Sequence, residues 1–390
     1  MKKSICRILL LINFSLSIIH YSFAQDSSHL RISLLTCTPG DELYSIFGHS
    51  AYRVIDSSSV TDVVYNYGTF DFNDEGFYIK FARGKLMYYV SAARFDDFVF
   101  DYQSSNRGIT EQVLNLTAAE KTTIQHFLNN NLKEENKYYK YDFFFDNCTT
   151  RLRDILKKNH DSSFTINPVM PAGTTFRQAI YQYLDKGQQH WSKLGIDLLL
   201  GKPCDAVMTA EQMQFLPDNL MKSLDSANHP MVLSHQNLYN INNGAIKKPI
   251  FTPFVVFTLL LILIVLISFS KHKIAHIFFK VFDWVLFFAT GLLGIILIFM
   301  TTATDHSMTK NNFNLLWAWP THFIMAFFIN SPQDGVHKKS WVKKYFAFSA
   351  MALVIVLLAW FFLPQHLNPS LIPFVLLLIY RSAVKSIGVK

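Results

Sequence analysis

The pattern of hydrophobic positions divides the chain into two parts. From Gln25 to Lys248 apolar and polar residues are mixed at short range, as in a globular domain, whereas almost every residue from Phe251 onward is apolar or aromatic. Such a density of apolar residues over the last third of a chain indicates helices that lie in a bilayer. The pattern predicts a folded domain over residues 25–248 and an all-α transmembrane region over residues 249–390.

The transmembrane region contains apolar segments separated by short polar connections. There are five: Ile250 to Phe269, Ile277 to Met300, Leu315 to Asn330, Tyr345 to Leu363, and Leu371 to Ala383. The third and fifth are short for a span, which needs about 20 residues. If the N-terminal domain lies outside, Lys and Arg concentrate in the inner connections at every loop, as the positive-inside rule requires. We therefore expect about five helices with basic inner loops and an exported N-terminal domain.

Two polar features interrupt this apolar region. Lys280 and Asp283 lie near the inner start of the second span, where we expect their side chains to snorkel to the interface. The outer loop from Thr304 through His306 to Trp317 is more polar than a short connector needs. It lies on the same side as the exported domain, so it is a candidate border of an active site.

The first 24 residues have the pattern of a secretory signal peptide. Lys2, Lys3 and Arg7 precede the apolar run from Ile8 to Ile19, and Ser22-Phe23-Ala24 supplies a small-x-small cleavage site. An uncleaved membrane anchor is the alternative. Both interpretations export the domain that follows.

The formal net charge of +8 is unevenly distributed. The exported domain is slightly acidic, and the excess of Lys and Arg belongs to the N-terminal segment and the transmembrane region. This distribution argues against nucleic acid as a partner.

Removal of the signal takes Cys6 and leaves Cys37, Cys148 and Cys204. Three cysteines in an oxidising compartment leave at least one thiol unpaired within the chain. Cys37 and Cys204 either form a disulfide or remain reduced and buried, and the sequence does not separate these possibilities.

The exported domain begins with a run of predicted strands and continues with helices. The strands are expected at Arg31 to Thr36, Ser45 to Ile55, Val60 to Tyr67, and Phe77 to Val90. Thr117 and Glu120 then form a capping box that predicts a helix from Ala118 to Lys133.

The most informative stretch is YYKYDFFFDNCTTRLRDIL, residues 138–156. Aromatic residues through Phe145 suggest an extended entry, and Leu152, Ile155 and Leu156 repeat at helical spacing. Cys148 is therefore expected in the first turn of a helix. Backbone N–H groups and the helix dipole favour an anion there, which lowers the pKa of a thiol and can also stabilise an oxyanion.

A cysteine nucleophile also needs a base and a group that orients the base. His49 in the strand FGHSAYRVI is the candidate base, and Asn66 in VVYNYG is the candidate orienting group, with Asp71 in reserve. Each has a purely structural alternative, because a lone cysteine is usually a small core residue and a strand histidine is usually satisfied or exposed.

The combination of a Gly-His strand and a later Asn-Cys helix start resembles the circularly permuted papain-like (NlpC-type) thiol enzymes, in which His precedes Cys. More closely, four segments resemble Lnb-type bacterial lipoprotein N-acyltransferases: TCTPGDELYSIFGHSAYRV, YNYGTFDF, YDFFFDNCTTRLRD and TDHSMTKNNFNLLW. This resemblance implies an α+β permuted papain-like domain fused to a membrane region, in the inner membrane of a bacterium with the catalytic domain in the periplasm.

The resemblance also implies an acyl transfer in two halves. Cys148 would take a fatty acyl chain from a membrane phospholipid as a thioester, and the N-terminal amine of a diacylated lipoprotein would then accept it. His49 would act as base with Asn66 orienting it, and Asn147, Tyr44 and His306 are expected at the substrate. No cofactor or metal is expected, because the sequence has neither a Gly-rich phosphate loop nor histidines at ligand spacing.

Two other functions fit the same residues. One is a membrane-tethered cysteine amidase or peptidase acting on the cell wall, or a phospholipase that passes the acyl group to water. The other is a non-catalytic membrane assembly factor with a degenerate papain-like domain, in which Cys148 would be structural.

Overall fold

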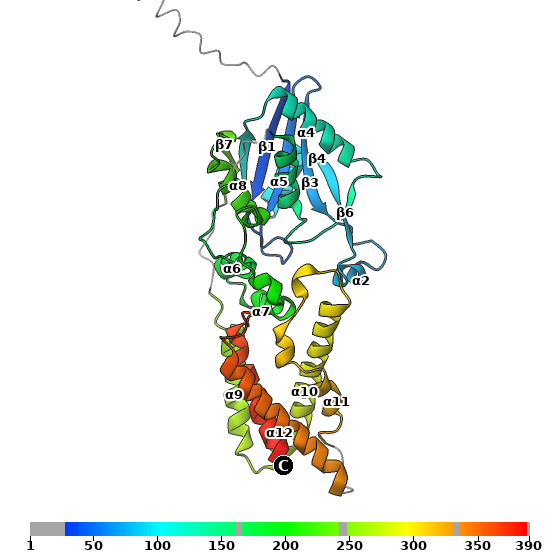
Figure 1. Ribbon diagram of the computed structural model, residues 1–390, viewed down its shortest axis with the longest axis vertical. Helices are drawn as coiled ribbons and strands as arrows, with labels where there is room; N and C mark the ends of the chain where they lie inside the picture. The colour runs from blue at the N-terminus through cyan, green and yellow to red at the C-terminus, as the bar shows by residue number, and fades with distance from the viewer. Residues whose placement is uncertain (1–27, 161–165, 242–247, 331–335, 388–390) are drawn as a thin grey trace, which may run out of the picture.

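The computed structural model describes residues 28–160, 166–241, 248–330 and 336–387, and the predicted signal peptide 1–24 lies outside these ranges. The described chain has an exported domain at one end and a bundle of apolar helices at the other (Figure 1). The N-terminal domain is α+β and the C-terminal region is helical, as predicted.

A seven-stranded sheet, antiparallel throughout, forms the centre of the exported domain. Its order is β6-β4-β3-β2-β1-β5-β7. The strands are β1 (Leu30–Cys37), β2 (His49–Asp56), β3 (Thr61–Thr69), β4 (Met87–Arg94), β5 (Ile109–Leu114), β6 (Tyr138–Lys140) and β7 (Val232–Tyr239). The central strand β1, LRISLLTC, is buried at seven of its eight positions, which indicates that both faces of the sheet are covered.

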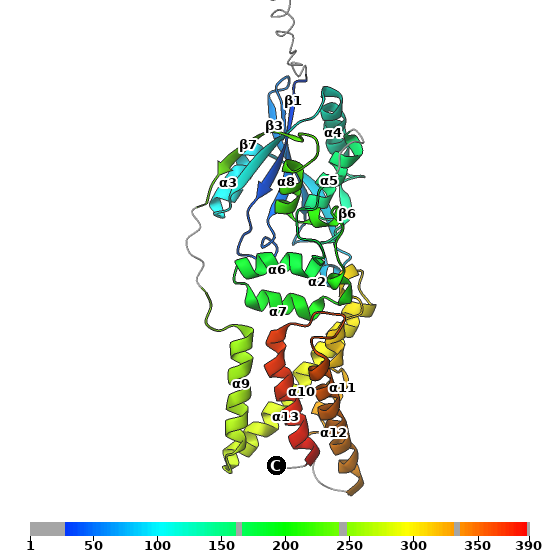
Figure 2. The ribbon, with the colours of Figure 1, turned by 60° about the vertical axis from the view of Figure 1, so that its left-hand side comes forward.

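Helices pack on both faces of this sheet. On one face lie α4 (Ala118–Asn131), α5 (Cys148–Asn159) and α8 (Pro217–Asp225), and on the other lies α3 (Phe95–Ser104) (Figure 2). Alternate residues of β1 explain this arrangement: Ile32 and Leu34 join the core under α4 and α5, whereas Leu35 packs with Phe98 of α3. Helix α5, which begins at Cys148, thus packs on strand β2, which begins at His49.

The predicted helix after Thr117 is confirmed, including both halves of its capping box: Glu120 N–H donates to Thr117 Oγ1 at 3.3 Å and Thr117 N–H donates to Glu120 Oε2 at 2.7 Å. The predicted strand Phe77 to Val90 is wrong in its first half, which forms the short helix α2 (Phe77–Ala82). Gly76 adopts φ 73° and starts this helix, and Phe77 and Phe81 stack one turn apart. The predicted strand from Ser45 starts only at His49, because Ser45 to Phe47 form a turn.

Two helices lie between the sheet and the apolar bundle. These are α6 (Phe176–Lys186) and α7 (His190–Leu199), which run across the direction of the bundle helices (Figure 2). Buried polar contacts join them to the membrane region: Asn314 donates to the Asp197 carbonyl at 2.9 Å, and Asn368 donates to the Asp197 carboxylate at 2.8 Å. Arg177 of α6 completes the cluster with an ion pair to Asp197 at 2.8 Å.

The membrane region consists of α9 (Pro253–Ser268), α10 (Lys273–Thr302), α11 (Thr321–Ala326), α12 (Val336–Ala359) and α13 (Ile372–Ile387). Among the described residues, three helices have the length and composition of a membrane span: Lys273–Thr302, Ser340–Ala359 and Pro369–Ile387. The first predicted segment is a shorter apolar helix, α9. The third, Leu315 to Asn330, is not one continuous helix, since a turn at Pro320 separates η4 (Phe313–Leu316) from the six residues of α11.

This third segment packs closely on α10 at two glycines of that helix. A Cβ on Gly291 would come within 1.9 Å of Phe323 N, and one on Gly294 within 2.2 Å of the Ala318 carbonyl oxygen. Small residues that let backbones approach are typical of helix contacts in membranes.

The expectation that Asp283 snorkels to the inner interface is wrong. Its side chain is fully buried and forms ion pairs with Arg381 at 2.7 Å and Lys385 at 2.6 Å, which joins α10 to α13. Both partners lie about a hundred residues after Asp283 in the chain, so no local sequence pattern indicates the pairing. A buried carboxylate in an apolar region is stable only when it is paired in this way.

Candidate active site

Cys148 lies at the first helical position of α5 because Asn147 caps the helix. The Asn147 side chain accepts from Thr150 N–H at 2.8 Å, and Asn147 N–H donates to Thr150 Oγ1 at 2.8 Å. The two amide hydrogens of Asn147 go to the carbonyls of Phe143 and Phe215, at 2.7 and 2.8 Å. Asn147 therefore uses its backbone N–H and its side-chain amide to fix the segment before Cys148. Its contact with the substrate stays a prediction.

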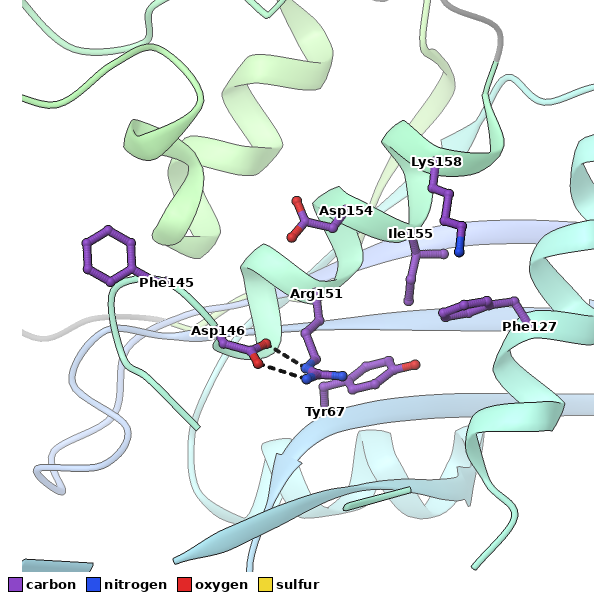
Figure 3. A pocket seen from close by; sticks show the side chains of 8 residues that line it. All are labelled: Tyr67, Phe127, Phe145, Asp146, Arg151, Asp154, Ile155 and Lys158. Atoms are coloured by element: carbon purple, nitrogen blue, oxygen red, sulfur yellow. Dashed lines mark hydrogen bonds and ion pairs between the residues drawn. The ribbon is translucent and has the colours of Figure 1, made fainter. Parts of the chain in front are cut away.

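An ion pair clamps the same segment from the other side. Arg151, one turn after Cys148, donates two hydrogen bonds to Asp146 at 2.7 and 2.8 Å, and its guanidinium lies 3.5 Å from the centre of the Tyr139 ring. Figure 3 shows Asp146 and Arg151 facing each other above Tyr67 of β3. They border a hollow of about 440 Å³ that contains none of His49, Asn66 and Cys148.

His49 starts β2, opposite Cys37 of β1. The preceding Gly48 adopts φ 81°, and a Cβ there would come within 2.7 Å of the Cys37 carbonyl oxygen. Only glycine fits this approach without strain. Gly48 thus allows the chain to turn closely past Cys37 immediately before His49.

The structure brings His49, Asn66 and Cys148 together. His49 Nε2 lies 3.2 Å from Asn66 Oδ1, and the imidazole is close enough to the Cys148 thiol for each group to shift the pKa of the other. With Asn66 Oδ1 as the acceptor, His49 Nε2 is the protonated ring nitrogen of the neutral imidazole. Asn66 holds this tautomer, which is the orienting role expected for the third member of a nucleophilic triad.

The pKa values in this cluster favour an ion pair. Burial alone raises the pKa of Cys148, but the charge of His49, its hydrogen bond, and donation from Ser50 N–H outweigh burial and lower the pKa from 9.0 to about 7. For His49, burial lowers the pKa, and the charge of Cys148 and hydrogen bonds to Cys148 and Asn66 raise it above its ordinary 6.5. A substantial fraction of thiolate is therefore present at neutral pH.

The other two cysteines of the exported domain behave differently. Cys37 and Cys204 are both free and buried, and they belong to separate core clusters, so the disulfide alternative is wrong. Burial raises the pKa of each thiol to about 12, although Arg107 and Arg177 respectively oppose the shift. Of these three thiols, only Cys148 has a lowered pKa.

The three other residues predicted for the site do not contact His49 in the bonds described for them: these are Asp71, Tyr44 and His306. Asp71 is exposed and its carboxylate accepts from Asn73 N–H at 2.8 Å, so Asn66 and not the reserve residue contacts His49. Tyr44 is 72% exposed in the loop before His49, and its role at the substrate stays a prediction. His306 hydrogen-bonds the Phe81 carbonyl at 3.1 Å, which places it against α2.

A second hollow of about 220 Å³ opens beside the imidazole. It is lined by His49 and Asn66 together with residues that the sequence had not singled out, namely Tyr67, Gly68, Thr69, Ser91, Phe98, Asp101 and Tyr102. On the other side of Cys148 stands Tyr141, since a Cβ on Gly68 would lie 3.7 Å from both the Cys148 Cβ and the Tyr141 ring. An aromatic residue five positions before DNC and a glycine two positions after Asn66 were the only sequence signals for these contacts.

Two family models match the chain in separate parts. The model of the Lnb N-terminal periplasmic domain matches residues 20–182, and that of the Lnb transmembrane domain matches residues 245–390. The chain belongs to the Lnb family. As an Lnb-type lipoprotein N-acyltransferase it has a periplasmic domain followed by a multi-helix transmembrane domain, and family membership implies lipoprotein N-acylation. No curated protein and no solved structure matches significantly.

The family assignment agrees with the division seen in the sequence. Residues 183–244 separate the two matched parts, and the second part begins near the start of the membrane region. Cys148, His49 and Asn66 all fall within the matched periplasmic domain. In the Lnb protein described here, the polar cluster around Asp197 joins these two parts into one body.

Proposed function

We propose that this Lnb protein transfers a fatty acyl chain from a membrane phospholipid to a lipoprotein through a thioester on Cys148, within a permuted papain-like domain. The observation that carries the proposal is the thiol in the first turn of α5, paired with an imidazole that Asn66 orients. A histidine on a strand that precedes a cysteine at a helix start is the order expected of the permuted papain-like enzymes.

In the first half of the reaction the Cys148 thiolate attacks the carbonyl carbon of a phospholipid ester. The backbone N–H groups at the start of α5 face the oxygen that becomes negative, and the helix dipole adds to this stabilisation. The C–O bond then breaks, protonated His49 gives its proton to the leaving oxygen, and a lysophospholipid departs. The product is an acyl thioester on Cys148.

In the second half the α-amine of a diacylated lipoprotein attacks the thioester. Neutral His49 accepts a proton from the amine, the C–S bond breaks, and Cys148 returns to the thiolate while an amide forms. Both substrates carry acyl chains in the leaflet that faces the periplasmic domain. This shared location is a reason for fusing a thiol domain to several membrane helices.

The test uses purified protein in lipid bilayers with a phospholipid of defined chains and a synthetic diacyl lipopeptide. We expect the lipopeptide to gain the mass of one acyl chain and the phospholipid to lose one, with Cys148→Ala as the inactive control. A lipopeptide of unchanged mass together with release of free fatty acid would show a phospholipase instead. No change in either substrate would favour a non-catalytic role.

A further inference from the structure

Helix α2 and the turn before it present large apolar side chains to the outside. Phe72, Tyr78, Ile79 and Phe81 are 63, 79, 68 and 51% exposed, which is unusual for neighbouring residues of this size on a water-exposed domain. Basic residues accompany them in the same segment, at Lys80, Arg83 and Lys85. Aromatic and aliphatic side chains interleaved with Lys and Arg are typical of segments at a membrane interface.

This exposed face of α2 is fixed to the outer end of a membrane helix. The loop that follows α10 donates from Asp305 N–H to the Arg83 carbonyl at 2.9 Å, and His306 Nε2 bonds the Phe81 carbonyl at 3.1 Å. A Cβ on Gly84 would lie only 3.2 Å from His306 N, so the two segments are in close contact. Figure 1 shows α2 beside the end of α10 that faces the sheet domain. The exposed apolar side chains of α2 therefore lie beside the end of a helix that is long and apolar enough to cross a membrane.

A continuous row of aromatic rings leads from this face to the nucleophile. Neighbouring centroids are 6.2, 5.9, 5.4 and 4.4 Å apart along the row Phe81, Phe77, Phe70, Tyr88 and Tyr141. The row ends at Tyr141, which borders Cys148 across the space left by Gly68. Rings at these separations are in contact, so the row is a continuous apolar connection in which Phe77 is buried and Phe70, Tyr88 and Tyr141 are partly exposed.

We propose that this aromatic row is the binding surface for an acyl chain of a phospholipid in the outer leaflet, which it leads from α2 to Cys148. The inference rests on the proposed function. Acceptor lipoproteins also carry acyl chains, but the row ends at Tyr141, beside the cysteine that would take the donor's acyl group, and for this reason we assign the row to the donor. His306 is then a positioning residue that holds α2 at the bilayer.

The experiment compares two acyl donors in the first half-reaction, with full-length protein in lipid bilayers and no acceptor. One donor is a phospholipid with 16-carbon chains, and the other is a water-soluble butyrate ester. The variant carries Tyr78→Ser, Ile79→Ser and Phe81→Ser, all at exposed positions. The control is Leu233→Ser on β7, which removes an aliphatic side chain of similar exposure, 62%, remote from α2 in the sheet order.

We expect the triple variant to acylate Cys148 from the bilayer phospholipid about tenfold more slowly or worse, and to react with the soluble ester at the rate of the wild type. Leu233→Ser should leave both rates unchanged. An undiminished rate from the phospholipid overturns the inference. Equal slowing with both donors also overturns it, because the surface would then support folding or self-association. If wild-type protein forms no adduct with either donor, the thioester mechanism itself fails.

Discussion

The pKa of the Cys148 thiol is the balance of burial, which raises it, and of neighbouring groups, which lower it. Burial works against ionisation of Cys148, whereas His49, Ser50 N–H and Thr149 favour the thiolate. The balance lowers the pKa of this thiol to about 7, while burial holds the pKa of Cys37 and Cys204 at about 12. Thiolate is the alkylated species, so the three cysteines should differ in reactivity at neutral pH.

Alkylation of Cys148 by iodoacetamide should follow a titration with a midpoint of about pH 7, with little reaction at Cys37 and Cys204 in the folded protein. The rate should fall about tenfold per pH unit below the midpoint, because only the thiolate reacts. Removing the imidazole in His49→Ala leaves the burial and should move the midpoint upward. Peptide mass spectrometry of each cysteine across pH measures this. A midpoint near 9.0 in the wild type, or one that His49→Ala does not change, would contradict the ion pair.

Asn66→Ala should lower the rate of acyl transfer by about 10²-fold, because the imidazole loses the bond that fixes its tautomer. Asp71→Ala is the matched control, since that carboxylate accepts from Asn73 N–H and does not contact His49. Single-turnover rates at several pH values separate loss of orientation from a changed pKa. A larger effect from Asp71→Ala than from Asn66→Ala would reverse the assignment.

At the scale of elements, the start of α5 determines where Cys148 lies. Asn147 both caps this helix and ties its preceding loop to Phe143 and Phe215. Thr149 and Tyr52 add bonds between α5 and β2, at 3.2 and 2.8 Å. Cys148 and His49, the proposed nucleophile and base, thus belong to two elements that are directly joined.

Asn147→Ala should lose the cap, worth about 1 kcal/mol, and leave two buried carbonyls unpaired at about 1–3 kcal/mol each. We expect a lower Tm together with slower alkylation of Cys148. Asn147→Asp keeps the cap acceptor and should recover part of the stability. If Asn147→Ala lowers only the affinity for lipopeptide, and leaves Tm unchanged, the residue binds substrate as first predicted.

Local sequence signals predicted the parts of this site that depend on neighbours in the chain. The capping box at Thr117, the helix start at Cys148 and the strand containing His49 were accessible because spacing and turn residues specify them. Helix α2 was missed since FYIKFA is compatible with either a strand or a helix, and Gly76 decides the outcome. Strand β7 pairs with β5 more than a hundred residues earlier, and no local pattern encodes such a partner.

At the scale of the whole molecule, buried polar contacts fix the periplasmic domain on the membrane region and hold the membrane helices together. Asp197 joins α7 to Asn314 and Asn368, and Asp283 joins α10 to Arg381 and Lys385 of α13. These partners are distant in sequence, which is why Asp283 was predicted to reach the interface instead. The contacts of Asp197 hold the periplasmic domain, which carries the proposed site, against the membrane region.

Asp283→Ala should destabilise the membrane region by about 3–5 kcal/mol, because the buried Arg381 and the partly buried Lys385 lose their counterion. Lys280→Ala is the control, since Lys280 is exposed on the same helix and should change stability little. Thermal unfolding in detergent, monitored by loss of monomer, compares the two. Equal stability of Asp283→Ala and the wild type would show that the ion pair contributes nothing to holding α10 and α13 together.

The most direct test of the central claim is the mass of the Cys148 peptide after the protein has reacted with phospholipid alone and been quenched with acid. The account predicts one added acyl chain on Cys148, removable by hydroxylamine as a thioester, strongly reduced in His49→Ala and transferred to the lipopeptide when acceptor is added. An unmodified Cys148 peptide, under conditions in which the same protein acylates the lipopeptide at full rate, would contradict it.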